Sequence, residues 1–192
     1  MRISMKLAAA LPVLLSASAA MAQNAPPPFP TKDVTVIYKT QGGPEMQMSW
    51  LVADQRVRID MTGGAGAMLM DVRGRKGFML MDEQKMAMEL PQDAMPAQTG
   101  QIPDGAKVTK GSTDTVAGLS CIIWLTEFQG VKSRSCVTTD GVMLAAGADG
   151  APAAIEATKV TYSAQDAKKF QVPEGYQVMQ MPGQGSSTPA AR

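Results

Sequence analysis

The sequence predicts a mainly β fold, a curved antiparallel sheet or incomplete β-barrel, with little helix after residue 22. Two observations predict this class. Apolar residues between 34 and 90 recur with a period of two, the spacing of a strand that buries one face. Turn residues interrupt that pattern about every ten residues, which is typical of an antiparallel meander. No segment after residue 22 shows the 3.6-residue apolar period of a long amphipathic helix.

The first 22 residues have the three parts of a secretory signal peptide. Arg2 and Lys6 give a positive start, Leu7–Leu15 is a short apolar stretch, and Ala20-Met21-Ala22 is a small-x-small cleavage site. The apolar stretch is too short to remain as a membrane-spanning helix. We therefore expect a periplasmic chain that begins at Gln23 and does not span the membrane.

Composition divides the rest of the chain into three parts. Residues 23–31 contain four prolines and predict an extended polyproline linker. Residues 182–192 are rich in Gly, Ser, Pro and Ala and predict a disordered tail. Residues 32–181 remain as a single antiparallel β domain. Without Arg2 and Lys6 the 16 basic and 17 acidic residues nearly balance. The chain therefore lacks the excess positive charge that binds nucleic acid.

The domain reads as short strands in sequence order. The first group precedes a Pro/Gln/Gly loop at 91–105, and its strands are expected at 34–38, 46–52, 56–61, 68–70, 78–81 and 86–90. The second group follows that loop, with strands expected around 108 and at 120–126, 131–137, 142–146 and 155–162. Residues 163–169 could hold one helical turn. The expected sheet has about nine to twelve strands and a strong curvature.

The two cysteines predict a structural disulfide, because an even pair in an oxidising compartment favours pairing. Both lie in strands that flank an expected turn at 127–130. If Thr126 pairs with Val131, Cys121 lies directly opposite Cys136. Closing a loop of this length stabilises the fold by about 3 kcal/mol in the chain-entropy model.

The number and spacing of the methionines are the most unusual features of the sequence. Ten of the 16 methionines lie between Met46 and Met95, and many are spaced i, i+2, which in a strand places both side chains on one face. Three interpretations stay open: core packing, an adaptable pocket for an apolar ligand such as an acyl chain, and a soft-metal Cu(I) site. The candidate ligand-binding residues are Met46, Met48, Trp50, Met68, Met70, Met79, Met81, Met86 and Met88.

Catalysis is the least expected function. The chain has no His, which removes Ser-His-Asp, Cys-His and His-based zinc arrangements. The Gly63–Gly66 run lacks the Gly-Lys-Ser/Thr that a phosphate loop requires. We therefore expect no enzyme activity, no cofactor and no conventional metal site, and the sequence leaves the oligomeric state open.

Three stretches resemble a known family. Met48–Val52 followed by Arg56–Met61 resembles the opening strands of lipoprotein-carrier domains. The pair Val116–Cys121 and Arg134–Gly141, with its V-A-G-x-x-C and C-V-T-x-D-G patterns, is similar to an uncharacterised secreted bacterial family of unknown function related to those carriers. Phe170–Tyr176 resembles that family's closing F-x-x-P-x-G-Y.

The resemblance implies a lipoprotein-carrier-like (LolA/LolB-like) incomplete barrel whose concave face is apolar. In the carriers this face binds the acyl chains of lipoproteins in the periplasm. The expected function is therefore a non-enzymatic periplasmic domain that holds an acyl-chain-like ligand or a lipoprotein on a Met-rich concave face. The alternatives are a Cu(I)-binding protein that uses the Met pairs, and an envelope structural or interaction protein with no small ligand.

Overall fold

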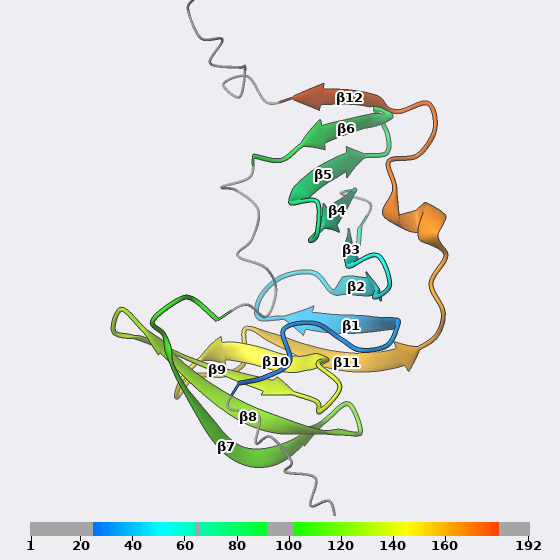
Figure 1. Ribbon diagram of the computed structural model, residues 1–192. Helices are drawn as coiled ribbons and strands as arrows, with labels where there is room; N and C mark the ends of the chain where they lie inside the picture. The colour runs from blue at the N-terminus through cyan, green and yellow to red at the C-terminus, as the bar shows by residue number, and fades with distance from the viewer. Residues whose placement is uncertain (1–24, 64–65, 92–101, 181–192) are drawn as a thin grey trace, which may run out of the picture.

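The computed structural model describes residues 25–63, 66–91 and 102–180. The signal peptide, Met95, Met181 and the tail lie outside these residues, so the predictions made for them are not addressed by the structure. Within them the chain forms one curved, open sheet of 12 strands with almost no helix (Figure 1). The predicted mainly β class is confirmed, and the sheet does not close into a barrel.

The strands follow one another along most of the sheet, whose order is β12-β6-β5-β4-β3-β2-β1-β11-β10-β9-β8-β7. The first six are β1 (Val34–Thr40), β2 (Met46–Leu51), β3 (Arg56–Met61), β4 (Ala67–Asp71), β5 (Lys76–Met81) and β6 (Met86–Glu89). The others are β7 (Lys107–Val116), β8 (Leu119–Phe128), β9 (Val131–Val137), β10 (Met143–Ala148), β11 (Ile155–Tyr162) and β12 (Gln177–Gln180).

Three hairpins of the β2–β6 meander use loops of the same length. Each connects its strands through four residues, because the last paired residues are five apart: Leu51 with Arg56, Asp71 with Lys76, and Met81 with Met86. The residue that ends each loop has a positive φ, namely Gln55, Arg75 and Lys85. This left-handed conformation is tolerated by polar residues in tight turns. Because the three loops have the same length, the apolar residues that alternate along each strand stay on one face of the sheet.

The hairpin that carries the disulfide differs from the prediction in register. Phe128 pairs with Val131 through a two-residue turn, and Gln129 and Gly130 both have positive φ, as a type I′ turn requires. The Cys121–Cys136 disulfide itself is present, with its Cα atoms 5.4 Å apart. Cys136 faces Ile123 directly, so the bridge is diagonal. The prediction of directly opposite cysteines was wrong because it assigned the turn four residues.

One strand pair departs from the antiparallel pattern. After β11 the chain crosses the sheet through the 3₁₀ helix η1 (Ala167–Phe170), and β12 then pairs with β6 in parallel. Phe170 anchors this crossing segment, because its side chain is buried. Further along, Val172 and Tyr176 pack against Ala67, Leu69, Leu80 and Ala87 in a small second core.

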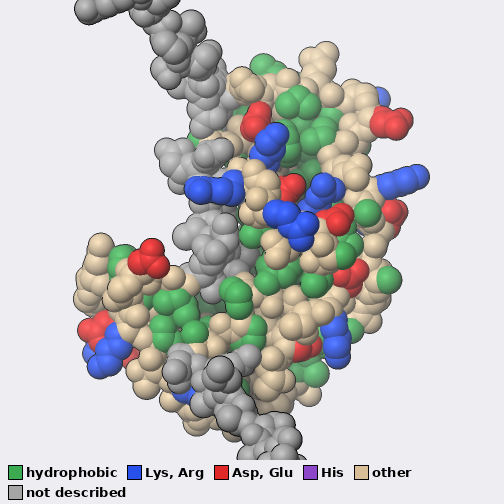
Figure 2. Space-filling model, viewed as in Figure 1, with side chains coloured by type: hydrophobic (Ala, Val, Ile, Leu, Met, Phe, Trp, Pro, Cys, Tyr) green, Lys and Arg blue, Asp and Glu red, His purple; other side chains and the backbone are tan. Residues whose placement is uncertain are grey.

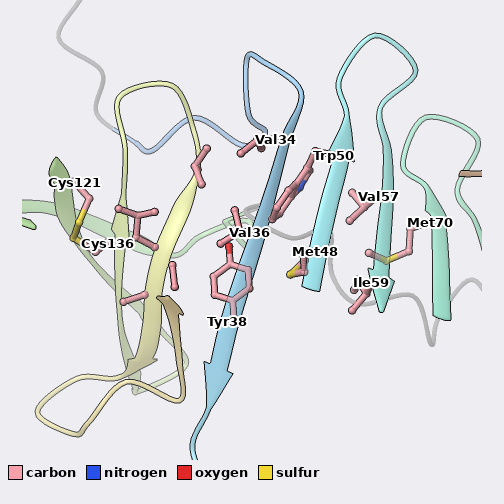
Figure 3. Packing of buried hydrophobic residues seen from close by; sticks show 14 residues of the cluster. Val34, Val36, Tyr38, Met48, Trp50, Val57, Ile59, Met70, Cys121 and Cys136 are labelled. Carbon is pink, nitrogen blue, oxygen red and sulfur yellow. A yellow bond between two sulfur atoms is a disulfide. The ribbon is translucent and has the colours of Figure 1, made fainter. Parts of the chain in front are cut away.

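The main core lies where β1 joins the two halves of the sheet. β1 pairs with β2 on one side and with β11 on the other. Val34, Val36 and Tyr38 of β1 have no exposed surface and pack against residues of β2, β3, β4 and β8–β11 (Figure 3). Alternate residues of β1 are buried, which confirms the period of two on which the strand prediction rests.

Candidate functional site

Strand register brings all nine predicted ligand-binding residues onto one face of the sheet. The central row crosses six strands as directly paired neighbours: Met48, Ile59, Met68, Met79, Met88 and Met179. A second row contains Trp50, Val57 and Met70, which lie side by side on adjacent strands in Figure 3. Met46 pairs with Met61, and Met81 pairs with Met86, two residues from the central row on the same face.

These residues differ in burial along the sheet. Met48, Trp50 and Met70 are buried and belong to the main core. Met46, Met68, Met81, Met86 and Met88 are half-buried, and the side chain of Met79 is 39% exposed. The face is therefore packed at Met48, Trp50 and Met70, with Met46 and Met68 against that core, and is partly open over β5 and β6. The core-packing interpretation suits the packed part and does not account for the exposure of Met79.

A groove is enclosed at the packed end of this face. It has a volume of about 200 Å³, and its walls include Met48 and Trp50 of β2 together with Ser133, Ser135 and Val137 of β9. Thr126 of β8 also lines the groove. In the sheet order four strands (β1, β11, β10 and β9) separate β2 from β8. Only the concave side of a curved sheet can bring two such distant strands to one cavity, so the methionine face is the concave face. Figure 2 shows hydrophobic side chains at the surface of both ends of the molecule.

Two walls of the groove differ in chemistry. One is apolar and includes Met143 and Ile102 besides Met48, Trp50 and Val137. The other presents hydroxyl groups from Thr126, Ser133 and Ser135, whose side chains alternate with those of the opposite face. Hydroxyls donate and accept hydrogen bonds, so the groove suits a ligand that has an apolar body and a polar carbonyl or hydroxyl.

The third wall is the proline-rich segment itself. Pro26, Pro27, Pro28 and Pro30 line the groove, and Pro30 is buried. We call residues 25–31 the N-terminal strap. The segment expected as a linker thus packs, over its described residues, against the concave face. An aromatic and apolar groove that holds a polyproline segment is a recurring mode of peptide recognition, and here the segment belongs to the same chain.

A turn between β9 and β10 holds the strap in place. The Thr31 amide donates to the Asp140 carbonyl oxygen over 2.9 Å. Gly141 has a φ of +90°, and a Cβ at this position would collide with the Phe29 carbonyl oxygen. Glycine at 141 therefore permits both the turn and the close approach of the strap.

Two tyrosines contact residues beside the groove and have raised pKa values. Tyr38 is fully buried, its hydroxyl donates to the Met143 carbonyl oxygen over 2.6 Å, and burial raises its pKa far above 10. The Tyr162 hydroxyl donates to the Asp140 side chain over 3.2 Å. Burial, followed by this hydrogen bond and the charge of Asp140, raises the pKa of Tyr162 to about 12. Both tyrosines are neutral hydrogen-bond donors at physiological pH.

The opposite, convex face carries a separate polar cavity of about 350 Å³ beneath the crossing segment. Arg58 projects there, because it alternates with Val57 and Ile59 of the concave face. Its guanidinium donates to the Asp60 carboxylate over 2.7–3.0 Å and to the Lys169 carbonyl oxygen over 3.0 Å. These contacts tie the crossing segment to β3.

Two kinds of feature are absent from the described part of the chain. It contains no group of three or more His, Cys, Asp or Glu side chains placed to hold a metal ion. None of its helices is long and apolar enough to cross a membrane.

Sequence reasoning missed the far wall of the groove and the strap. Val137, Met143, Ser133 and Ser135 come from strands that lie close to β2 only after the sheet has curved, and no local pattern encodes that. The one available signal was Asp140-Gly141, a turn whose glycine also admits the strap.

Two solved structures share the fold of this chain. An uncharacterised conserved protein from Thermus thermophilus is 8% identical, with a TM-score of 0.56 over 78% of this chain and 91% of that one. PNGF-II is 11% identical, with a TM-score of 0.54, and the match covers 78% of this chain but only 32% of PNGF-II. A weaker likeness is to MucB in complex with MucA(peri), which is 14% identical, with a TM-score of 0.49 over 77% of this chain and 57% of MucB.

No curated protein matches the chain. A family model described as a domain of unknown function, DUF4412, matches residues 34–146, which run from the first residue of β1 into β10 and include the disulfide hairpin. These residues make up more than half of the sequence and most of the concave face, so the chain belongs to the DUF4412 family.

Proposed function

We propose that the protein is a non-enzymatic periplasmic binding domain that holds an acyl-chain-like ligand, free or attached to a lipoprotein, on its concave face. The groove between β2 and β8–β10 carries this proposal. It combines an apolar wall of Met48, Trp50 and Val137 with a hydroxyl wall that can pair with an ester or amide carbonyl. The resemblance to lipoprotein carriers supports the ligand class, and the signal-peptide pattern and the disulfide support the compartment.

The size of the groove indicates how a ligand would enter. Its volume of about 200 Å³ lies below the 300–1,000 Å³ range of most small-molecule sites. The strap forms one wall through four prolines and is held near Thr31 by one backbone hydrogen bond to Asp140. A long acyl chain would therefore displace the strap rather than bind beside it. Unbranched Met48 and Met143 can repack around ligands of different shape.

The first experiment identifies what the protein carries. Native mass spectrometry of protein purified from its own periplasm should show a bound lipid-sized mass, and fluorescent fatty acids should bind and be competed off by unlabelled ones. The absence of both a bound lipid and fatty-acid binding would overturn the proposal.

A pair of variants localises the binding. Met143→Gln places an amide in the apolar wall and should weaken fatty-acid binding about tenfold, since each 1.4 kcal/mol corresponds to one factor of ten. Met61→Gln makes the same change on the same face outside the groove, at a side chain that is 41% exposed, and should leave the affinity unchanged. Equal effects of the two variants would place the ligand elsewhere.

A further inference from the structure

The open end of the concave face has a feature that the acyl-chain proposal does not use. Met68, Met79, Met88 and Met179 are direct cross-strand neighbours on β4, β5, β6 and β12. We call these four residues the thioether row. No other side-chain type interrupts it. Directly paired residues in a sheet have Cα atoms about 4.5–5.5 Å apart, so long side chains from three consecutive strands can converge on one point.

Met68 packs against the main core, whereas burial and strand propensity do not explain the other three members of this row. Met79 is 39% exposed and Met179 is 47% exposed, while Met68 and Met88 are half-buried. Exposed strand positions favour β-branched and aromatic residues, because these fit a pleated surface. Three consecutive unbranched thioethers at partly exposed positions instead keep the sulfur atoms reachable from solvent.

The row is formed by flexible side chains. Met side chains have three rotatable bonds and can turn toward a common centre.

We propose that the thioether row binds a monovalent soft metal ion, Cu(I). Thioethers are soft ligands that select Cu(I) over the hard cations, which prefer oxygen. Three of them, Met79, Met88 and Met179 on consecutive strands, form a neutral donor set that matches a single positive charge. The chain has no His to hold Cu(II). This proposal does not depend on the acyl groove, to which the row contributes no side chain.

The test is a titration of the chain from Gln23 to Arg192 with Cu(I), without oxygen, in competition with a chromogenic Cu(I) chelator. One Cu(I) should bind per chain with a sub-micromolar dissociation constant. X-ray absorption should show a coordination shell of sulfur only. Binding that is micromolar or weaker, or a shell of oxygen or nitrogen atoms, would overturn the proposal.

Variants separate the row from the rest of the methionines. Met79→Leu with Met88→Leu keeps similar volume and should lower the Cu(I) affinity by about 100-fold, a tenfold loss for each 1.4 kcal/mol. Met61→Leu is the matched control, because Met61 shares the face and the exposure but pairs with Met46 outside the row. It should keep the wild-type affinity. Equal affinities of the double variant and the wild type would refute the site.

Two further measurements keep the test decisive. If the double variant unfolds, Met179→Leu on the exposed edge strand should still lower the affinity about tenfold, and an unchanged affinity would count against the site. Thioethers take up no proton between pH 5 and 8, so the Cu(I) affinity should be constant over that range. A fall in affinity as the pH decreases would show a ligand that takes up a proton and exclude a thioether-only site.

Discussion

Tyr38 connects the two halves of the sheet by a hydrogen bond through the core. It comes from β1, passes into the main core, and donates to the carbonyl oxygen of Met143 on β10. The ladder between β9 and β10 is irregular between Met143 and Ala145, so this carbonyl lies at a break in regular pairing. A buried carbonyl without a partner costs about 1–3 kcal/mol, which gives the tyrosine hydroxyl a structural role.

Tyr38→Phe should therefore lower the free energy of unfolding by about 1–3 kcal/mol, because it leaves the Met143 carbonyl oxygen without its donor. Urea denaturation followed by fluorescence measures this change. Tyr176→Phe is the control, since the Tyr176 hydroxyl bonds to Asp82 at an exposed position. A loss below about 0.5 kcal/mol for Tyr38→Phe would contradict the assigned role.

The same residue predicts a pH dependence. Burial raises the pKa of Tyr38 in the folded protein, whereas tyrosine in the unfolded chain ionises near pH 10. Below pH 10 both states are protonated and stability does not change through this group. Above it only the unfolded state loses the proton, so stability should fall by up to about 1.4 kcal/mol per pH unit. Urea denaturation between pH 8 and 11 should show a shallower fall for Tyr38→Phe, and identical slopes would contradict the prediction.

Residue patterns predicted a shared face, of which only Met48 and Trp50 line the groove. The i, i+2 spacing placed nine side chains on one face, and the register confirms that they share it. The pattern could not say which of them are buried, because burial depends on what lies over the sheet. It also could not supply Val137 and Met143, which are far away in sequence and reach the groove only through curvature.

At the scale of elements, the strap and the β9–β10 turn form one unit. The strap lies against the turn at a place where Gly141 has no side chain. A proline-rich sequence alone predicts an extended backbone and gives no information on whether that backbone packs. The linker expectation rested on the composition, whereas the packing depends on a glycine more than a hundred residues away.

Gly141→Ala should release the strap, because its Cβ collides with the Phe29 carbonyl oxygen. The Thr31 amide, which donates to Asp140, should then exchange its hydrogen faster, and fatty-acid affinity should rise because the groove opens. Gly118→Ala is a matched control, since Gly118 also has a positive φ but nothing lies within 4 Å of the added carbon. Both variants carry backbone strain, so a shared effect on Thr31 exchange would exclude the steric explanation.

The disulfide hairpin shows how an element can be predicted while its register is not. Cys121 and Cys136 were expected to pair and do, but the turn has two residues in place of four. Replacing both with Ala should lower the free energy of unfolding by about 3 kcal/mol, the chain-entropy value for a loop of this length. The register should persist, because Gln129-Gly130 favours the type I′ turn. Denaturation and backbone NMR test the two statements separately.

For the whole molecule, the open sheet has two edge strands, β7 and β12, which differ in sequence and in pairing. β7 carries charged residues and an irregular pairing between Lys110 and Thr113, both of which discourage pairing with another chain. β12 reaches its edge because the crossing segment brings the chain back to β6, with which β12 pairs in parallel. Local patterns predicted the meander, but not this return, since it depends on a contact between the two ends of the domain.

Phe170 secures this return over the convex face. Its side chain is buried, and it follows Lys169, whose carbonyl oxygen accepts from Arg58. Phe170→Ala should cost about 3–5 kcal/mol, the usual range for a buried phenylalanine. Hydrogen exchange should rise in β12 and β6 and stay unchanged in β8 and β9. A uniform rise across the sheet would show that the crossing segment does not act as a local clamp.

The graded exposure of the concave face also has a consequence for oxidation. Met sulfur is converted to the sulfoxide, which is polar, and this conversion follows access to solvent. Met179, Met61 and Met79 should react with hydrogen peroxide first, while Met48 and Met70, at 3% and 4% exposure, should react last. Peptide mass spectrometry over time gives this order directly. Damage would then begin at exposed side chains outside the packed core, and the fold would persist after these thioethers had been oxidised.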